Sequence, residues 1–188
     1  MQNKTNIGID AAHELVQNAF VASGLNEQSA QSVARALVMA EAEGQVGHGF
    51  SRVGDYIAQM KSGKINANAT PSVMSQSPSY LHVSADNGFA YPALDLAIDH
   101  AVEMAAKTGC VAIAVSQSNH CGTLASHVEK LAMQGLIGIM VANTPAAIAP
   151  WGAIDRYTGR TRSHLQPLAR VRIHWSLIYP CPSLHAVR

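Results

Sequence analysis

The sequence predicts an α/β protein that begins with a helical part. Two patterns support this fold class. Up to about residue 78, apolar residues recur at the spacing of amphipathic helices, and from 79 to 152 short apolar runs alternate with helical segments. A hydrophobic content of 48% with only 13% charged residues is typical of a folded globular protein. Periodicity alone does not give the order of the strands.

Three helices are expected in the N-terminal part. The first covers residues 9–23 and ends at Gly24, and Asn26 can cap the second, which runs to about Gly44. A short loop then leads into a third helix at about 51–60. This part of the chain is therefore expected to form a small helical layer.

Strands and helices alternate in the part that follows. Residues 72–78 are expected to be strand or coil, and residues 79–85 alternate like a strand before the turn Asp86-Asn87-Gly88. The remaining elements are a long helix at 91–107, apolar runs at 110–118 and 136–144 that are expected to be buried strands, and a helix at 124–135. Loops at the carboxyl ends of such strands are where α/β proteins bind ligands.

Net charge and cysteine content argue against several functions. A formal net charge of +1 gives no electrostatic reason to expect a nucleic-acid or membrane partner. No apolar run is long enough to span a membrane, and the N-terminal residues lack the apolar core of a signal peptide. Cys110, Cys121 and Cys181 form no paired motif. A reduced, cytoplasmic setting is therefore expected.

His48 and Arg52 form the first candidate site. His48 stands between Gly47 and Gly49 at the start of the third helix, where the helix N-terminus is expected to lower the pKa of an imidazole. The two side chains share one face if the helix begins near His48. An imidazole that exchanges a proton, beside a guanidinium that binds a carboxylate, suits a 2-oxo or 2-hydroxy acid. From the residues alone, a loop histidine with a solvated arginine is the alternative.

A second polar loop follows the first apolar strand. Asn119, His120 and Thr123 offer hydrogen-bond donors and acceptors there. Cys121 is next to His120, but adjacent residues rarely point at each other, so a Cys–His dyad is disfavoured. A metal site from His120, Cys121 and His127 matches no common ligand spacing, and no metal is expected. His127 falls within a predicted helix and is expected to be a surface or packing residue.

Asn143 and Thr144 follow the second apolar run and could line a cofactor cleft. An ordinary exit from a strand is an equal alternative. The chain has no GxGxxG after a strand, and Gly135-Leu136-Ile137-Gly138 is not such a motif. The usual dinucleotide fingerprint is therefore absent, and these patterns alone do not predict a nicotinamide enzyme.

Taken together, the segments 40–65, 86–109 and 118–152 resemble the malate/L-lactate dehydrogenase family of nicotinamide-dependent enzymes, which lacks a Rossmann fold. The first segment carries an acidic helix end, a His-Gly step, an arginine four residues later and then a tyrosine. The resemblance covers about residues 9–152, in the correct order. It implies an α/β fold with a helical N-terminal part and a mixed sheet, truncated to the N-terminal half.

The resemblance also implies roles for single residues. His48 would donate or accept the substrate proton, and Arg52 would bind the carboxylate. His120 would face the reacting carbon, and it has the acid/base role in some members. The cofactor would be NAD or NADP. The residues expected at this cofactor are Asn119, Thr123, Asn143 and Thr144. The serine that commonly precedes the first histidine is replaced by Gly47, so activity would drop if that serine relays a proton or orients the imidazole.

The composition changes abruptly after Gly152. Residues 1–152 hold seven Lys and Arg against eleven Asp and Glu, whereas residues 153–188 hold six Arg, no Lys and one Asp. In the reading frame offset by two bases, residues 155–169 can encode Pro-Leu-Tyr-Gly-Thr-Asn-Pro-Ile-Ser-Leu-Ala-Ala-Pro, which contains a Gly-Thr-Asn-Pro motif of the family. We therefore expect an out-of-frame tail from about residue 153. A basic arm that binds RNA or acidic lipid is the alternative.

The sequence thus predicts a helical part at 1–78, an α/β part at 79–152 that contributes to a cofactor and substrate cleft, and the tail at 153–188. The expected function is that of an NAD(P)-dependent oxidoreductase that interconverts a small, malate- or lactate-like 2-hydroxy acid and its 2-oxo acid. A truncated, catalytically incomplete remnant of such an enzyme is the alternative. Because family members resemble intertwined dimers, the intact enzyme is expected to be a homodimer.

Overall fold

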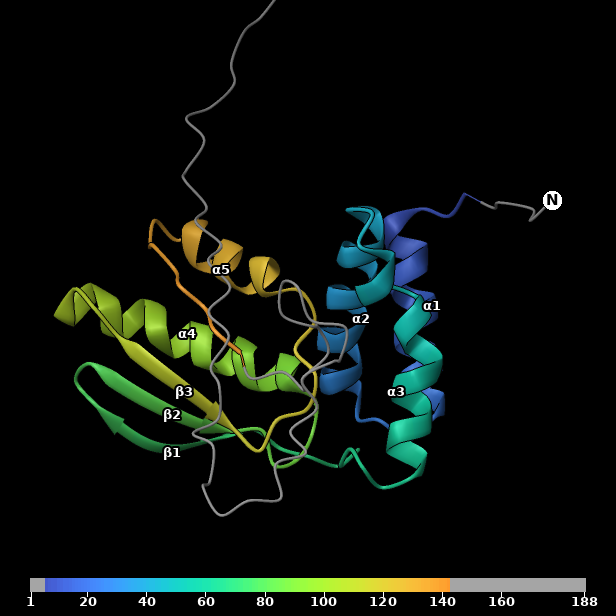
Figure 1. The fold of residues 1–188 in the computed structure, drawn as a ribbon, viewed down its shortest axis with the longest axis horizontal. Helices are drawn as coiled ribbons and strands as arrows, with labels where there is room; N and C mark the ends of the chain where they lie inside the picture. Colours follow the sequence, from blue (N-terminus) through green and yellow to red (C-terminus); the bar gives the residue numbers. More distant parts are fainter. Residues whose placement is uncertain (1–5, 143–188) are drawn as a thin grey trace, which may run out of the picture.

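The computed structural model describes residues 6–142 of the chain. Its elements, in order, are α1 (Ile9–Ala22), α2 (Glu27–Ala42), the short 3-10 helix η1 (Val46–His48), α3 (Ser51–Lys61), β1 (Ser72–Ser77), β2 (Tyr80–Ser84), α4 (Ala90–Thr108), β3 (Ala112–Ser116) and α5 (Leu124–Ala132). Figure 1 shows α1, α2 and α3 packed together on one side, and the sheet with α4 and α5 on the other. The prediction of a mixed α/β fold with a helical N-terminal part is confirmed.

Local signals in the sequence set the limits of the helices. The Asn26 side chain accepts a hydrogen bond from the main-chain amide of Ser29 at 2.8 Å, which caps α2 as expected. Gly109 ends α4 in the left-handed conformation, with φ of 77°. The helices α1, α2 and α3 bury a common core that includes Phe20, Leu37 and Tyr56. Burial of this apolar stripe is what stabilises the helical layer.

The sheet contains three strands in the order β1-β2-β3. The strands β1 and β2 form an antiparallel hairpin, whereas β2 and β3 are parallel and joined through α4. Leu81 and Val83 of β2 are buried against Ala93 and Ala97 of α4. Because β2 and β3 are parallel, the loops after both strands lie at the same edge of the sheet, beside the start of α4.

The helix α4 joins the two layers. Tyr91, in its first turn, belongs to the core of the helical layer, and Ala93 and Ala97 belong to the core under the sheet. Figure 1 shows α4 lying between the sheet and α5. The edge of the sheet that carries the polar loops is therefore held next to α2 and α3.

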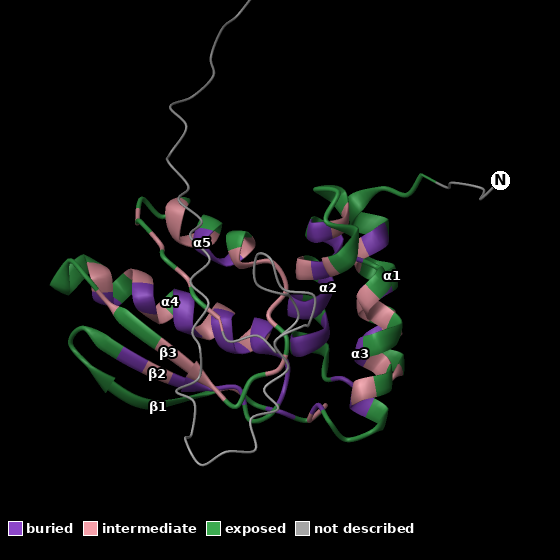
Figure 2. Ribbon diagram, viewed as in Figure 1, coloured by how far each residue is buried: buried purple, intermediate pink, exposed green. Residues whose placement is uncertain are grey.

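Two expectations for the sheet are wrong. The strand β3 forms as predicted, but its residues are exposed or half-buried instead of buried. The run 136–144 forms no strand among its described residues, which show only a bridge at Ala142, and Ile137 and Ile139 are 86% and 61% exposed. Among residues 6–142, α4 covers one face of the sheet and no helix covers the other, as the exposed residues of β1 and β3 in Figure 2 show. An apolar run becomes a buried strand only where a second layer covers it.

Candidate active site

His48 ends the 3-10 turn that precedes α3. The helix begins at Ser51, three residues after His48, so His48 and Arg52 are not parts of one continuous α-helix and do not share a helix face. The carboxylate of Glu41, near the end of α2, accepts a hydrogen bond from the main-chain amide of Phe50 at 2.8 Å. A Cβ atom at Gly49 would lie 2.1 Å from the same carboxylate, so only glycine fits there. The Glu41 contact therefore fixes the turn that presents His48.

Arg52 is nevertheless next to His48, because its side chain folds back on the turn. Its Nε donates to the carbonyl oxygen of Gly47 at 2.6 Å, and its Nη1 lies 3.6 Å from the carboxylate of Asp55. The side chain is 38% exposed. The contact with Asp55 is long and exposed and so contributes little to stability. Arg52 therefore has donors that remain available for a carboxylate.

His120 comes to the same place from the loop after β3. That loop is tied to the turn at Asp86–Gly88, because the main-chain amide of Asn119 and its side-chain amide both donate to the carbonyl oxygen of Gly88 at 3.1 Å. The Asn119 side-chain amide also donates to the carbonyl oxygen of Asn87 at 2.8 Å. Asn119 thus positions His120 by holding the two loops together.

The rings of His48 and His120 are 5.6 Å apart between centroids, with planes inclined by 33°. Tyr56 of α3 is buried, and its hydroxyl lies 2.9 Å from Nδ1 of His120 and 3.0 Å from the hydroxyl of Tyr91. The main-chain amide of Gly122 donates to the same Nδ1 at 3.0 Å. The structure thus brings His48, Arg52 and His120, from two distant parts of the chain, into one cluster.

The electrostatics of this cluster favour neutral imidazoles. Burial lowers the pKa of His48, and the charge of Arg52 lowers it further. The pKa of His120 is lowered by burial and then by the charges of His48 and Arg52. The predicted direction for His48 therefore agrees with the structure, although burial is the main cause. Because each ring opposes protonation of the other, the pair favours at most one proton near neutral pH.

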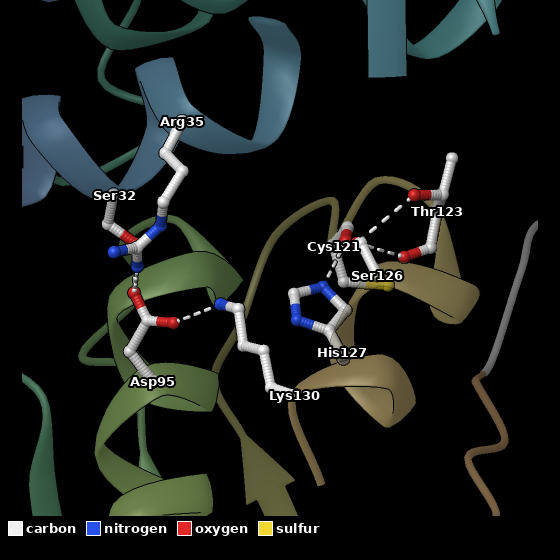
Figure 3. Close-up of polar contacts among 8 residues, drawn as sticks. All are labelled: Ser32, Arg35, Asp95, Cys121, Thr123, Ser126, His127 and Lys130. Atoms are coloured by element: carbon white, nitrogen blue, oxygen red, sulfur yellow. Dashed lines mark hydrogen bonds and ion pairs between the residues drawn. The ribbon is translucent and has the colours of Figure 1, made fainter. Parts of the chain in front are cut away.

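Cys121 and His127 lie beside this cluster and do not form a nucleophilic pair. The Nε2 atom of His127 is 2.8 Å from the carbonyl oxygen of Cys121, so the contact is with the main chain and not with the thiol (Figure 3). Burial raises the pKa of the Cys121 thiol, which disfavours a thiolate. His127 is buried, as a packing residue would be. Among residues 6–142, no group of three His, Cys, Asp or Glu is placed to hold a metal ion.

An ion-pair cluster fixes α5, which follows the His120 loop. Asp95 of α4 binds Arg35 of α2 at 2.7 Å and Lys130 of α5 at 2.5 Å, and it accepts a hydrogen bond from Ser32 (Figure 3). Burial acts to raise the pKa of Asp95, but hydrogen bonds from Lys130 and Ser32 and the charges of Lys130 and Arg35 outweigh it and lower the pKa. Three helices are thereby joined at one carboxylate.

The residues expected at the cofactor do not form a recognisable cofactor site among the described residues. The amide nitrogen of Asn119 is already used by the loops, and the Thr123 hydroxyl donates to Ser126 at 3.1 Å. Asn143 and Thr144 lie outside the described residues, as does the tail from residue 153. Of the residues expected at the cofactor, the two that the structure describes, Asn119 and Thr123, are thus hydrogen-bonded within the chain.

Tyr56 and Tyr91, which were not predicted as site residues, also belong to this cluster. Tyr56 follows Arg52 by four residues, so helical spacing alone places both on one face of α3. No comparable local signal marks Tyr91, because its hydroxyl meets that of Tyr56 across 35 residues of sequence.

None of the described helices is long and apolar enough to cross a membrane. Proteins of named activity match most of this chain. The (2R)-3-sulfolactate dehydrogenase (NADP(+)) of Chromohalobacter salexigens is 38% identical over 146 residues, which are 78% of this chain and 44% of that protein. The ureidoglycolate dehydrogenase (NAD(+)) of Escherichia coli O157:H7 is 29% identical over 153 residues, or 81% of this chain and 44% of that protein.

Solved structures of related dehydrogenases have the same fold over most of this chain. Malate dehydrogenase from Pyrococcus horikoshii OT3 superposes with a TM-score of 0.76 at 28% identity, over 83% of this chain and 45% of that one. The chain thus spans less than half the length of these relatives. The family model described as malate/L-lactate dehydrogenase matches residues 7–161. On this evidence the chain belongs to the malate/L-lactate dehydrogenase family.

Proposed function

We propose that this chain supplies the substrate-binding and proton-handling residues of an NAD(P)-dependent oxidoreductase, which interconverts a small 2-hydroxy acid and its 2-oxo acid. One observation carries the proposal: the rings of His48 and His120 meet at 5.6 Å beside Arg52. These are a carboxylate-binding cation and two neutral imidazoles, which is the set of groups that this chemistry requires.

Arg52 binds the carboxylate of the substrate in this proposal. Its Nε is held by the Gly47 carbonyl oxygen, which leaves the Nη atoms to form charge-assisted hydrogen bonds with the carboxylate. The carboxylate displaces the weak contact with Asp55. The C2 carbon of the substrate, which is bonded directly to the carboxylate carbon, then lies towards the two imidazoles.

The imidazoles handle the oxygen on C2. Oxidation of the alcohol releases the hydroxyl proton, which a neutral imidazole accepts, and reduction of the ketone returns it. A nicotinamide, when bound, would exchange a hydride with C2. The described residues serve the other needs of the reaction: they bind the carboxylate, orient the C2 oxygen and move one proton.

The substrate is a compact 2-hydroxy acid of the malate or lactate type. The carboxylate beside the reacting carbon is the element that Arg52 recognises, and the names of the relatives include malate, sulfolactate and ureidoglycolate. We propose NAD or NADP as the cofactor, and a homodimer for the intact enzyme.

A catalytically incomplete remnant is the second candidate function. The chain spans 44% of the length of the sulfolactate dehydrogenase it matches, so more than half of a complete enzyme has no counterpart in the match. In this case the chain retains the carboxylate-binding groups without completing the cofactor site.

Two measurements on the purified chain test these proposals. The first is a titration with oxamate, an unreactive 2-oxo acid analogue, followed by the ring signals of His48 and His120 in NMR spectra. The second is the absorbance of NADH and NADPH with a panel of 2-oxo acids. Binding with turnover supports the enzyme, and binding of oxamate without turnover or cofactor binding supports the remnant. If oxamate leaves both rings unchanged, the substrate site proposed here is wrong.

A further inference from the structure

The Nδ1 atom of His120 is approached by two groups. The main-chain amide of Gly122 lies 3.0 Å from it, and the hydroxyl of Tyr56 lies 2.9 Å from it. A main-chain N–H can only donate a hydrogen bond, so Nδ1 must present its lone pair and carries no proton. The neutral ring then has its proton on Nε2.

The direction of the remaining hydrogen bonds follows from this. With no proton on Nδ1, the Tyr56 hydroxyl is the donor towards His120, and it shares the single lone pair of Nδ1 with the Gly122 N–H. Its oxygen is then free to accept, and the Tyr91 hydroxyl at 3.0 Å is positioned to donate to it. Both tyrosines are only 2% exposed, and burial raises the pKa of each, so both hydroxyls keep their protons.

We propose that the Tyr91–Tyr56 hydroxyl pair and the Gly122 amide fix His120 as the Nε2–H imidazole. This inference rests on the proposed function for its catalytic meaning: His120 donates a hydrogen bond to the C2 oxygen through Nε2, and His48 is the imidazole that gains and loses the proton. Tyr56 and Tyr91 are positioning residues, because they act on the substrate only through His120.

The surroundings of the two rings agree with this division of roles. His120 is exposed as a residue and its Nδ1 is occupied by Tyr56 and Gly122, which leaves Nε2 as the ring nitrogen for a substrate. The other titratable or charged groups near Tyr56 are Arg52, Cys121 and Asp55. Those whose charges lower the pKa of His120 are His48 and Arg52. For His120 to accept a proton, Nδ1 would have to carry one against the Gly122 N–H. His48 differs from His120 in this respect: its Nδ1 is buried and, among the described residues, has no hydrogen-bond partner, so no N–H donor opposes a proton on this atom.

The experiment is a long-range ¹H–¹⁵N correlation spectrum of the labelled chain, with the His120 signals assigned by their loss in His120→Gln. We expect Nε2 to appear as a protonated nitrogen and Nδ1 as an unprotonated, hydrogen-bonded one. Tyr56→Phe should shift the Nδ1 resonance towards that of a free acceptor. Tyr91→Phe should shift it in the same direction by a smaller amount, because loss of the outer hydroxyl weakens the donor that remains. The matched control Tyr80→Phe, on β2 and 40% exposed, should leave it unchanged.

A proton on Nδ1 of the unchanged chain would overturn the proposal, and so would an unshifted resonance in folded Tyr56→Phe. If Tyr56→Phe does not fold, the tautomer of the unchanged chain and the Tyr91→Phe shift still decide the question. No substrate or cofactor is present in these measurements. A chain that shows the expected tautomer but never binds oxamate would therefore refute the proposed function and leave the hydrogen-bond assignment standing.

Discussion

The carboxylate of Glu41 accepts a hydrogen bond from the main-chain amide of Phe50 directly across Gly49, one residue after His48. We expect Gly49→Ala to lower the free energy of unfolding by about 1–3 kcal/mol, the usual cost of forcing an extra methyl group into a filled space. It should also shift the His48 ring signals, because the turn must move. Chemical denaturation and NMR spectra give the two readings.

Gly47→Ala is the matched control for this substitution. A Cβ atom at Gly47 meets nothing within 4 Å, so its cost should stay below about 0.5 kcal/mol. Equal losses in the two variants would show that Glu41 does not fix the turn.

Lys130 should stabilise the chain through Asp95, to which it is hydrogen-bonded. We expect Lys130→Met to lower the free energy of unfolding by about 1 kcal/mol at pH 7, since the side chain is partly exposed. Because the pKa of Asp95 is lowered in the folded chain, its stabilisation is present above the unfolded value of about 3.9 and is lost as the pH falls through the folded value. The difference in melting temperature between the two proteins should therefore shrink below about pH 4.

Lys107→Met provides the comparison, because Lys107 is an exposed residue in the last turn of α4. Its effect should be a few tenths of a kcal/mol, from the helix dipole alone. A pH-independent loss in Lys130→Met would mean that the contact with Asp95 is not its cause.

His127 should make the stability of the chain depend on pH. Burial lowers its pKa in the folded chain, so the unfolded chain binds an additional proton as the pH falls below about 6.5. Stability should therefore decrease as the pH falls from 7 towards 5. The contribution of His127 is at most about 1.4 kcal/mol per pH unit.

In His127→Gln, the slope of unfolding free energy against pH should become shallower, while the contributions of His48 and His120, whose pKa values are also lowered, remain. The half-buried His100 of α4 serves as the control in His100→Gln. An unchanged slope in His127→Gln would show that His127 becomes charged without penalty in the folded chain.

The two cysteines of the described chain should differ in reactivity. Burial raises the pKa of Cys121, whereas Cys110 is exposed. Iodoacetamide at pH 7.5 should therefore modify Cys110 several-fold faster than Cys121, as measured by mass spectrometry of the separate peptides. Preferential labelling of Cys121 would reveal an activated thiol and reopen the dyad interpretation.

The helices could be predicted from local sequence signals. Asn26, Gly24 and Gly109 mark helix ends by their own chemistry, and these signals act over a few residues. The run at 136–144 could not be judged in this way, because apolar composition describes a strand only when another layer covers it. The same limit applies to β3, whose exposure depends on what lies over the sheet.

The candidate site shows the same division between local and long-range information. His48 and Arg52 were identifiable because they are close in sequence and chemically suited to one substrate class. The placement of His120 opposite His48 depends on the parallel pairing of β2 with β3, which periodicity does not reveal. The roles of Tyr56 and Tyr91 depend on a contact between layers.

The hydroxyl pair of Tyr56 and Tyr91 also has a consequence for the order of events during synthesis. The pair spans 35 residues, and the contact from Tyr56 to His120 spans 64. Contacts of such long range form after local helices, because the loop that they close must first be ordered. A growing chain can therefore complete α1, α2 and α3 before the proton of the His120 imidazole is fixed on one ring nitrogen. The ring of His120 is fixed as one tautomer only after residue 122 has left the ribosome and the helical layer has packed against the sheet layer.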